Sequence, residues 1–308
     1  GLGDVYKRQG LEGRTRAMLK IEDGCVNFCS YCIIPYARGP VRSLSLSAAV
    51  EQAEKLAQDG YREIVLTGIE ISSWGQDLPG EQTLIDLLET VCRDLPGEVR
   101  IRLGSLEPRT ITPDFCRRAA ALPNLCPHFH LSMQSGCDAV LARMNRKYDS
   151  ARYYESVQLL HGYFDRPAIT TDLIVGFPGE TEQDFEDSMA FVAGQRFLKV
   201  HVFPYSRREG TPAFDFPNQV PEHEKESRSR RMTAAVEKVR AELAHAAQGR
   251  TAQVLLETPL SSTLFTGYTK QYLPVVVNAP GHKSGEIVTV TLGEWDGKRC
   301  RALSLIHI

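Results

Sequence analysis

The chain has 308 residues, of which 42% are hydrophobic and 24% are charged, and its formal net charge is -2. This composition is typical of a globular protein of about two domains, and no apolar run approaches the length of a membrane span. The small net charge excludes a general basic excess that would attract nucleic acid, so any RNA contact would depend on local patches.

Both ends of the chain look foreign to the rest. Residues 4–9 (DVYKRQ) and 303–308 (LSLIHI) can be encoded by opposite strands of one short DNA word, which resembles a sequencing-library adaptor. We therefore predict that 1–9 and 303–308 are adaptor-derived, and we exclude them from fold reasoning. It follows that the natural N-terminus is expected upstream, where a further domain could precede this chain.

Short apolar strands alternate with amphipathic helices from about residue 14, as in a parallel sheet or barrel. Strands are predicted at 17–21, 63–68, 99–105, 128–133, 169–176 and 198–203. Helices are predicted at 47–59, 82–94, 112–121, 136–145, 150–163 and 181–193. Six strand–helix units are fewer than the eight of a closed (β/α)₈ barrel. We therefore predict an open, partial barrel over 10–220.

Polar residues alternate with apolar ones in several of these strands. The polar members are Arg100, Arg102, His128, His130, Ser132, Asp172 and His201. A strand that is buried on both faces is normally apolar on both. The recurrence therefore predicts a barrel lumen that holds a polar ligand, although for any single residue a satisfied core or rim position is the alternative.

The last third of the chain changes character. Residues 221–248 form one long charged helix with apolar residues at heptad-like spacing, which either packing against the barrel or a coiled coil would explain. Over 249–302, short β runs (AQVLLE, YLPVVV and EIVTVTL) are broken by Gly and Pro. They predict a small β-barrel of about the size of an oligonucleotide-binding fold.

Three cysteines form one tight cluster. Cys25, Cys29 and Cys32 lie in GCVNFCSYC just after the first strand, where such barrels build active sites. Structural zinc sites pair two knuckles, and no second knuckle is present. Three thiolates suit a 4Fe–4S cluster with one open iron, and a degenerate zinc knuckle is the alternative. The other cysteines have no motif spacing and are interpreted as small apolar residues in a reducing compartment: Cys92, Cys116, Cys126, Cys137 and Cys300.

The CxxxCxxC spacing after the first strand resembles that of the radical S-adenosylmethionine (SAM) superfamily. Further motifs follow in the order seen in its methylthiotransferases: IEDGCVNFCSYCIIPYARGPVRS, LTGI, RLGSLEP, HFHLSMQSGC, MNRKY, TDLIVGFPGET and FPYSRREGTPA. CPHFHLSMQSGCD, MNRKY and GYTKQY look most like the branch that acts on threonylcarbamoyladenosine in tRNA. The branches that act on isopentenyladenosine tRNA or on a ribosomal protein fit less well. One departure is Val26, which precedes Asn27 where the family has Asn directly after the first Cys.

The resemblance implies an α/β fold, with an open partial (β/α)₆ radical-SAM barrel, a connecting helix at 221–248 and a TRAM-like RNA-binding β-barrel. It implies that Cys25, Cys29 and Cys32 hold a 4Fe–4S cluster whose open iron binds SAM. Cleavage of SAM would give a 5′-deoxyadenosyl radical, which removes hydrogen from the 2-position of N6-threonylcarbamoyladenosine next to the anticodon. Sulfur insertion and methylation would follow, and no catalytic acid or base is required for the hydrogen abstraction.

The resemblance also implies cofactor-binding residues around the cluster. The expected contacts are Tyr31 on the adenine, Gly68 and Glu70 beside the methionine amino group, Ser105 and Glu107 at the ribose hydroxyls, and Gln134 and Gly176 at the cofactor rim. Each has an ordinary structural alternative. These alternatives are loop packing for Tyr31, a β–α turn for Gly68, a surface loop for Glu107 and a capped turn for Gly176.

The expected partners are tRNA and a reductant such as flavodoxin or ferredoxin. The protein is expected to be a cytoplasmic monomer that does not bind a membrane. In the C-terminal domain, Arg250, Lys270 and Lys298 offer cations, and Tyr268 and Tyr272 are expected to stack on bases, with solvated surface positions as the alternative. The family also carries an upstream domain with a second 4Fe–4S cluster. This chain is therefore expected to bind one cluster and cleave SAM without inserting sulfur. A non-catalytic zinc- and RNA-binding protein is the competing function.

Overall fold

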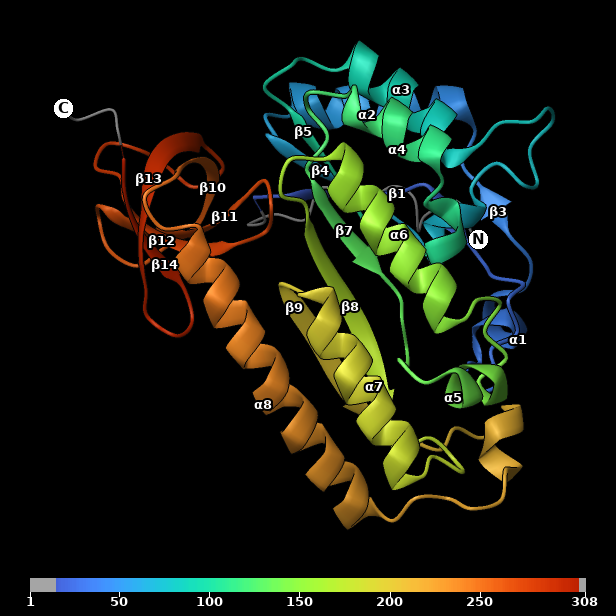
Figure 1. The fold of residues 1–308 in the computed structure, drawn as a ribbon. Coiled ribbons are helices and arrows are strands. Elements are labelled where there is room, and N and C mark those ends of the chain that lie inside the picture. Colours follow the sequence, from blue (N-terminus) through green and yellow to red (C-terminus); the bar gives the residue numbers. More distant parts are fainter. Residues whose placement is uncertain (1–14, 305–308) are drawn as a thin grey trace.

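The computed structural model describes residues 15–304 and contains two β-rich units joined by a long helix (Figure 1). Residues 1–9 and 305–308, which the sequence predicts to be adaptor-derived, lie outside this range. Leu303 and Ser304 lie inside it, in the last strand. In the described part of the chain, every helix is either too short or too polar to cross a lipid bilayer.

The first unit is an open barrel of parallel strands. One run of strands is β1 (Ala17–Lys20), β4 (Glu63–Thr67) and β5 (Arg100–Leu103), and the second is β6 (Ser105–Leu106), β7 (His128–Leu131), β8 (Ala168–Val175) and β9 (Lys199–Pro204). All neighbouring pairs are parallel, and only Gly104 separates β5 from β6, so the runs form six successive strand positions. Within residues 15–304, β9 is not paired with β1. The predicted open barrel is therefore confirmed.

Helices cover the outer side of these strands. They are α2 (Leu46–Gln58), α3 (Leu84–Asp94), α4 (Pro113–Ala120), α6 (Ser150–Tyr163) and α7 (Glu182–Gln195). The predicted cap of α7 is present, because Thr181 and Asp184 exchange side chain–backbone hydrogen bonds. The apolar faces of the helices and strands meet in one core, where Leu19, Ile101 and Phe129 are fully buried. Burial of each such side chain contributes about 1.5–3 kcal/mol.

Short elements lie at the C-terminal ends of the strands. They are the hairpin of β2 (Glu22–Asp23) and β3 (Arg42–Ser43), helices α1 (Ile34–Arg38) and α5 (Asp138–Arg143), and 3₁₀ turns at Ile71–Ser73, Pro108–Thr110 and Pro212–Asp215. In Figure 1, α1 and α5 lie at the end of the barrel towards which β7 and β8 run, away from the C-terminal unit.

Helix α8 (Glu222–Ala246) runs beside β9 and α7 and continues to the C-terminal unit (Figure 1). Met232 and Val236 on its inner face are buried in the barrel core, and Ala244 near its end is buried in the core of the C-terminal unit. Of the two explanations that the heptad-like spacing allowed, a helix packed against the barrel is therefore the observed one.

The C-terminal unit is a closed five-stranded β-barrel. Its strands are β10 (Thr251–Pro259), β11 (Leu264–Thr269), β12 (Pro274–Asn278), β13 (Ile287–Trp295) and β14 (Cys300–Ser304), paired in the order β10-β11-β12-β14-β13 with β13 returning to β10. Leu303 pairs with Asn278 and Thr291. The last strand thus extends two residues past the predicted domain end at 302, into the segment predicted to be adaptor-derived.

A buried ion-pair network connects the two units. Glu63 on β4 accepts hydrogen bonds from Arg100 Nε at 2.5 Å and Arg102 Nε at 2.7 Å, and all three side chains are at most 2% exposed. Burial alone would raise the pKa of Glu63, but Arg102 and Arg100 lower it to about 2. The arginines also donate to the end of β11 and to the turn after it, from Arg100 to Tyr268 O at 3.0 Å and from Arg102 to Lys270 O at 2.9 Å.

Stacked rings reinforce this contact between the units. Tyr272 stacks on Tyr268 and on His128, with ring centroids 4.6 Å apart in both pairs. The guanidinium carbon of Arg102 lies 5.0 Å from the Tyr272 ring, and Lys270 Nζ donates to Pro123 O at 3.2 Å. Both tyrosines and Lys270 therefore contact the first unit, and their role in RNA binding stays a prediction.

The five cysteines outside the cluster are buried and have free thiols. Burial raises the pKa of Cys92 to about 12 and that of Cys300 to about 11, so these thiols stay protonated and unreactive at neutral pH. All five lie among buried apolar side chains, which agrees with their predicted role as small apolar residues.

Substitution Glu63→Gln should lower the free energy of unfolding by about 3–5 kcal/mol, because it leaves two buried guanidinium groups without a counter-ion. Glu98→Gln is the matched control. Glu98 pairs with Arg62 at 3.1 Å on the surface, with its side chain 62% exposed, so its loss should cost less than about 1 kcal/mol. Urea unfolding of both variants measures the difference, and equal midpoints would contradict the role given to Glu63.

Candidate cluster and cofactor site

The three-cysteine loop is held tightly at its start. Gly24 has φ +89°, and a Cβ there would lie 2.0 Å from Pro40 O, so only glycine fits. The N–H of Cys25 donates to Gly39 O at 3.1 Å. The loop therefore leaves β2 in a fixed direction, against the segment that returns to β3.

The middle of the loop is anchored to the segment that follows α5. Ser30 N–H donates to Met144 O at 3.0 Å, and Ser30 Oγ donates to Arg143 O at 2.8 Å. Asn145 Nδ2 donates to Phe28 O at 2.8 Å. These contacts connect positions more than 110 residues apart in the chain, and they hold Cys29 in a buried position while Cys25 and Cys32 are half-buried.

Burial favours the protonated form of two of the three thiols, Cys25 and Cys32. Burial raises the pKa of Cys25 to about 11 and also raises that of Cys32. A metal centre at this loop must therefore displace protons, as thiolate ligation requires. Cys25 Sγ accepts a hydrogen bond from Asn27 N–H at 3.5 Å, so the inserted Val26 leaves Asn27 in contact with the first cysteine.

Arg146 is a functional candidate that sequence reasoning missed. Its Nη1 donates to Cys29 Sγ at 3.1 Å, its Nη2 donates to Ser132 O at 3.3 Å, and its guanidinium carbon lies 4.8 Å from the Tyr148 ring. Within residues 15–304 it forms no ion pair with a carboxylate, so the charge of this part-buried cation faces the cysteine sulfur. The MNRKY motif marked this segment, but only the fold shows which of its residues reaches the cysteines.

The residues present fit a 4Fe–4S cluster. In such a cluster the thiolates bind separate irons, and hydrogen bonds to the sulfurs tune its potential. The loop supplies three thiols, and Arg146 and the Asn27 N–H supply the hydrogen bonds. In the described range, no three His, Cys, Asp or Glu side chains converge closely enough to hold a single metal ion.

A cavity of about 270 Å³ opens beside Cys25. Two of the predicted cofactor-binding residues, Glu70 and Glu107, line it together with Cys25. Burial raises the pKa of Glu70 to about 7, and its carboxylate accepts the Ser72 N–H at 3.2 Å. Glu107 is 5% exposed and pairs with Arg109 at 2.9 Å. Two carboxyl groups therefore face the space next to the first cysteine.

The backbone of Gly68 lies close to the side chain of Glu22. A Cβ at Gly68 would lie 2.6 Å from Glu22 Oε2. That oxygen accepts the N–H groups of Ile69 at 2.9 Å and Glu70 at 2.8 Å, so Glu22 orients the loop that carries Glu70. Glu22 was not predicted, because no spacing relates it to Glu70. Burial raises its pKa to about 7.

Two further candidates, Tyr31 and Gly176, pack against other residues of the chain. Tyr31 packs edge-to-face on Phe177 with ring centroids 6.3 Å apart, as its loop-packing alternative predicts. Gly176 has φ +71°, and a Cβ there would lie 2.4 Å from Lys225 Cγ on α8, so a turn against that helix explains it. Gln134 lies three residues after β7 with a positive φ of 67°, and its N–H donates to Asp172 O at 2.9 Å.

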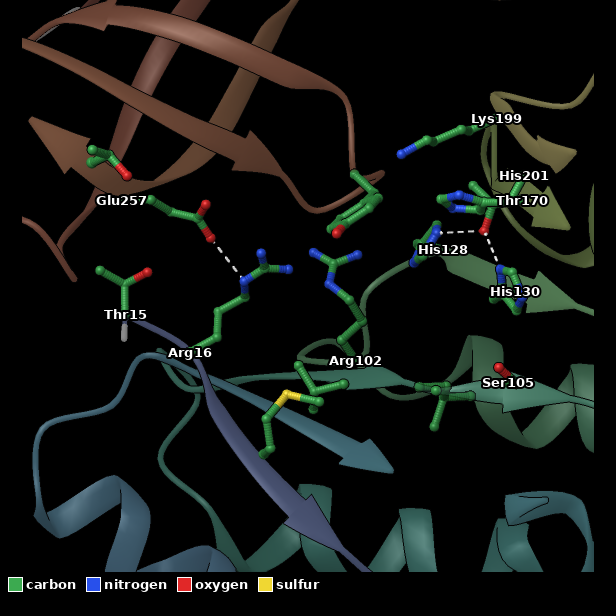
Figure 2. Close-up of a pocket in the computed structure, with 16 residues that line it drawn as sticks. Thr15, Arg16, Arg102, Ser105, His128, His130, Thr170, Lys199, His201 and Glu257 are labelled. Atoms are coloured by element: carbon green, nitrogen blue, oxygen red, sulfur yellow. Dashed lines mark hydrogen bonds and ion pairs between the residues drawn. The ribbon is translucent and has the colours of Figure 1, made fainter. Parts of the chain in front are cut away.

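Ser105 is separated from Glu107. It lines a second, larger cavity of about 580 Å³ in the barrel lumen, and the cavity beside Cys25 does not include it. Ser105 and Glu107 thus line different cavities, and their contact with ribose hydroxyls stays a prediction. Arg102, His128, His130 and His201 also line this second cavity (Figure 2), so the polar lumen that the strand alternation predicted is present.

Comparison with known proteins identifies the family. Residues 19–192 match the Radical SAM superfamily. The chain belongs to the radical SAM superfamily. It is 38% identical over 283 residues to threonylcarbamoyladenosine tRNA methylthiotransferase of Bacillus subtilis, which covers 91% of this chain and 62% of that relative. The enzyme of the same name from Thermotoga maritima is 35% identical over 303 residues, which covers 97% of this chain and 67% of that relative.

A second group of relatives carries a different enzyme name. The tRNA-2-methylthio-N(6)-dimethylallyladenosine synthase of Clostridium botulinum strain Loch Maree is 39% identical over 242 residues, covering 79% of this chain and 54% of that protein. This radical SAM chain thus spans from 54% to 67% of the length of these three relatives.

Solved structures share the fold of the barrel. A radical S-adenosylmethionine methyltransferase from Kitasatospora setae matches with a TM-score of 0.55 at 17% identity, over 69% of this chain and 40% of that one. Coproporphyrinogen III oxidase from Escherichia coli matches with a TM-score of 0.54 at 14% identity, over 78% of this chain and 56% of that one. At these identities the likeness shows the fold, and the predicted radical SAM barrel is confirmed.

Glu22→Gln should make stability less dependent on pH. The folded-state pKa of Glu22 is about 7, above the unfolded value of about 4.3. The folded state therefore keeps a proton that the unfolded state loses, and this residue's share of stability declines as pH rises from about 4.3 to 7. Gln can still accept the two N–H bonds, so urea midpoints at about pH 5.5 and 8 should differ less in the variant. Glu98→Gln should keep the wild-type difference, and an unchanged slope in Glu22→Gln would contradict the assignment.

Proposed function

We propose that this chain is the radical SAM and C-terminal part of a tRNA methylthiotransferase, which adds a methylthio group at the 2-position of N6-threonylcarbamoyladenosine next to the anticodon. The observation that carries the proposal is the Cys25–Cys29–Cys32 loop at the C-terminal end of a radical SAM barrel. Arg146 donates to Cys29 there, and two buried carboxyl groups lie beside Cys25.

The cofactor assignment follows from this site. Cys25, Cys29 and Cys32 would hold the 4Fe–4S cluster, and the cavity beside Cys25 would receive SAM. When bound, the cluster supplies the electron that cleaves SAM to methionine and the hydrogen-abstracting 5′-deoxyadenosyl radical. A cationic amino group beside Glu70 would lower the pKa of that carboxyl from about 7, so that it binds as a carboxylate. Arg146 would offset the negative charge of the thiolates.

The tRNA substrate is supported by alignment length. Relatives named for threonylcarbamoyladenosine align over 91% and 97% of this chain, including most of the C-terminal β-barrel, whereas the dimethylallyladenosine relative aligns over 79%. We therefore favour threonylcarbamoyladenosine and keep dimethylallyladenosine as the second candidate.

We also propose that 249–302 is a TRAM-like module that contacts tRNA through exposed cations. Two of the three predicted cations, Arg250 and Lys298, are exposed. The electron donor would be a flavodoxin or ferredoxin, and the protein would act as a cytoplasmic monomer. Sulfur insertion would require a second cluster from an upstream domain, as the family resemblance implies.

Each of Cys25→Ala, Cys29→Ala and Cys32→Ala should abolish the cluster and SAM cleavage. The reconstituted wild-type chain should be brown and contain about four irons per chain, as one cubane requires. Cys126→Ala, at a buried cysteine outside the loop, should keep both properties. Full SAM cleavage in a loop variant would remove that residue from the site. A colourless zinc protein would support the non-catalytic alternative, and about twice the iron would contradict a single cluster.

Nucleoside analysis of tRNA from cells that lack the gene tests the substrate. N6-threonylcarbamoyladenosine should accumulate there without its 2-methylthio group, because the group that this enzyme adds is missing. Re-expression of the complete gene should restore the modification, and a version carrying Cys29→Ala should not. Loss of methylthio groups only from dimethylallyladenosine would instead assign the second candidate substrate.

A further inference from the structure

Two aromatic rings lie exposed at the cysteine end of the barrel. Phe28, between the first two cysteines of the loop, and Tyr36 on α1 are 47% and 57% exposed. Their rings pack edge-to-face with centroids 5.7 Å apart. Single exposed apolar residues are common, but adjoining ones mark interaction sites. Val26 is also exposed, and it lines the cavity beside Cys25, so this apolar surface reaches the rim of that cavity.

The backbone presents the Phe28 ring in a strained conformation. Phe28 has φ +48°, in the left-handed region that bulky side chains seldom adopt. The conformation is held from outside the loop, because Asn145 Nδ2 donates to Phe28 O at 2.8 Å. Strained backbone of this kind is concentrated at functional sites. Backbone strain and an exposed ring both destabilise the folded chain, so the fold alone does not explain a phenylalanine here.

Cations lie on two sides of the ring pair. Lys147 Nζ donates to Asn145 Oδ1 at 2.8 Å, so this exposed lysine lies beside the residue that holds Phe28. Lys147 forms no ion pair with a carboxylate among residues 15–304. Arg38, two positions after Tyr36, has a half-exposed side chain whose contact with the buried Asp23 is long, at 3.8 Å.

A third cation comes from the segment after β9, which returns against the cysteine loop. Ala213 N–H donates to Ser30 O at 2.8 Å, and a Cβ at Gly210 would lie 3.1 Å from Ile33 Cδ1. Arg208, two positions before Gly210, is exposed. In the described part of the chain it has no carboxylate partner. The positive charge of this face is therefore available to a partner.

Exposed rings among exposed cations fit single-stranded RNA. Bases stack on aromatic side chains, and cations contact the phosphates between those bases. The bases of a duplex are already stacked inside the helix, whereas those of a loop can be splayed out onto a protein. An acidic protein would satisfy the cations, but it gives no reason for a strained backbone that exposes a ring. The combined features of this face therefore favour an RNA loop.

We infer that Phe28 and Tyr36 form a stacking platform for one base of the RNA loop that carries the target adenosine. Arg38, Lys147 and Arg208 would contact the phosphates of that loop. The platform would hold a neighbouring base while the target adenosine enters the adjoining cavity. The inference rests on the proposed tRNA substrate, and it adds which residues of this chain hold that substrate.

Fluorescence anisotropy of the cluster-loaded chain tests the platform with two labelled RNAs, a hairpin with the anticodon-loop sequence and a fully paired duplex. Phe28→Asn removes the ring, and asparagine tolerates the left-handed conformation. This variant should therefore keep the wild-type urea midpoint and bind the hairpin about fivefold more weakly or worse, with duplex binding unchanged. Tyr154→Ala removes an exposed ring of α6 and should change neither affinity.

Three further variants separate stacking from charge. Tyr36→Leu lies outside the cysteine loop and removes the second ring, so it should weaken the hairpin alone. Lys147→Ala and Arg208→Ala should weaken both RNAs and flatten the salt dependence of binding, because each removes a phosphate contact.

The inference is overturned if the wild-type chain does not bind the hairpin, or if the two ring variants bind it as tightly as Tyr154→Ala does. Equal losses for hairpin and duplex in the ring variants would also exclude stacking. If Lys147→Ala and Arg208→Ala keep RNA affinity but slow reduction of the cluster by flavodoxin, the face belongs to the electron donor instead. SAM cleavage by the wild type and nucleoside analysis of cellular tRNA use none of these variants, so the proposed function is tested separately.

Discussion

The arrangement of the two units depends on one buried carboxylate. Glu63 neutralises Arg100 and Arg102, and both arginines also donate to carbonyls at the end of β11 or in the turn after it. Without that carboxylate, two desolvated cations would face each other at the base of the barrel, at a cost of several kcal/mol. The geometry of the triad also sets one wall of the lumen cavity, because Tyr272 follows the same turn.

The two ends of the barrel carry different sets of side chains. At the C-terminal ends of the strands, the cysteine loop, Glu70 and Glu107 surround a small polar cavity. At the N-terminal ends, basic and imidazole side chains meet the C-terminal barrel. Parallel strands cause this separation, because all their carboxyl ends lie at one edge and all their amino ends at the other. Helix α8 lies beside β9 and extends to the C-terminal barrel, so it joins the two units along one side.

Residues that are distant in the sequence hold the cysteine loop and its surroundings in place. Arg146 reaches Cys29 from a segment that lies 117 positions later in the chain. Glu22 orients the backbone of Glu70 across 48 positions. Both contacts place charged groups around the cysteines without belonging to the cysteine motif. Hydrogen bonds of this kind orient metal ligands and tune the centre they hold, so they are as relevant to the chemistry as the ligands.

Local sequence information determined the elements and the cysteine loop. Strand and helix periodicity, the cap at Thr181 and the CxxxCxxC spacing each depend on residues within a few positions, and the structure agrees with them. Only the tertiary structure decided which side chains contact one another. Tyr272 stacks on His128, Gly176 lies against Lys225, and Ser105 lines a different cavity from Glu107. Such contacts join residues brought together by packing, and no periodicity along the chain encodes which distant side chain will fill a given space.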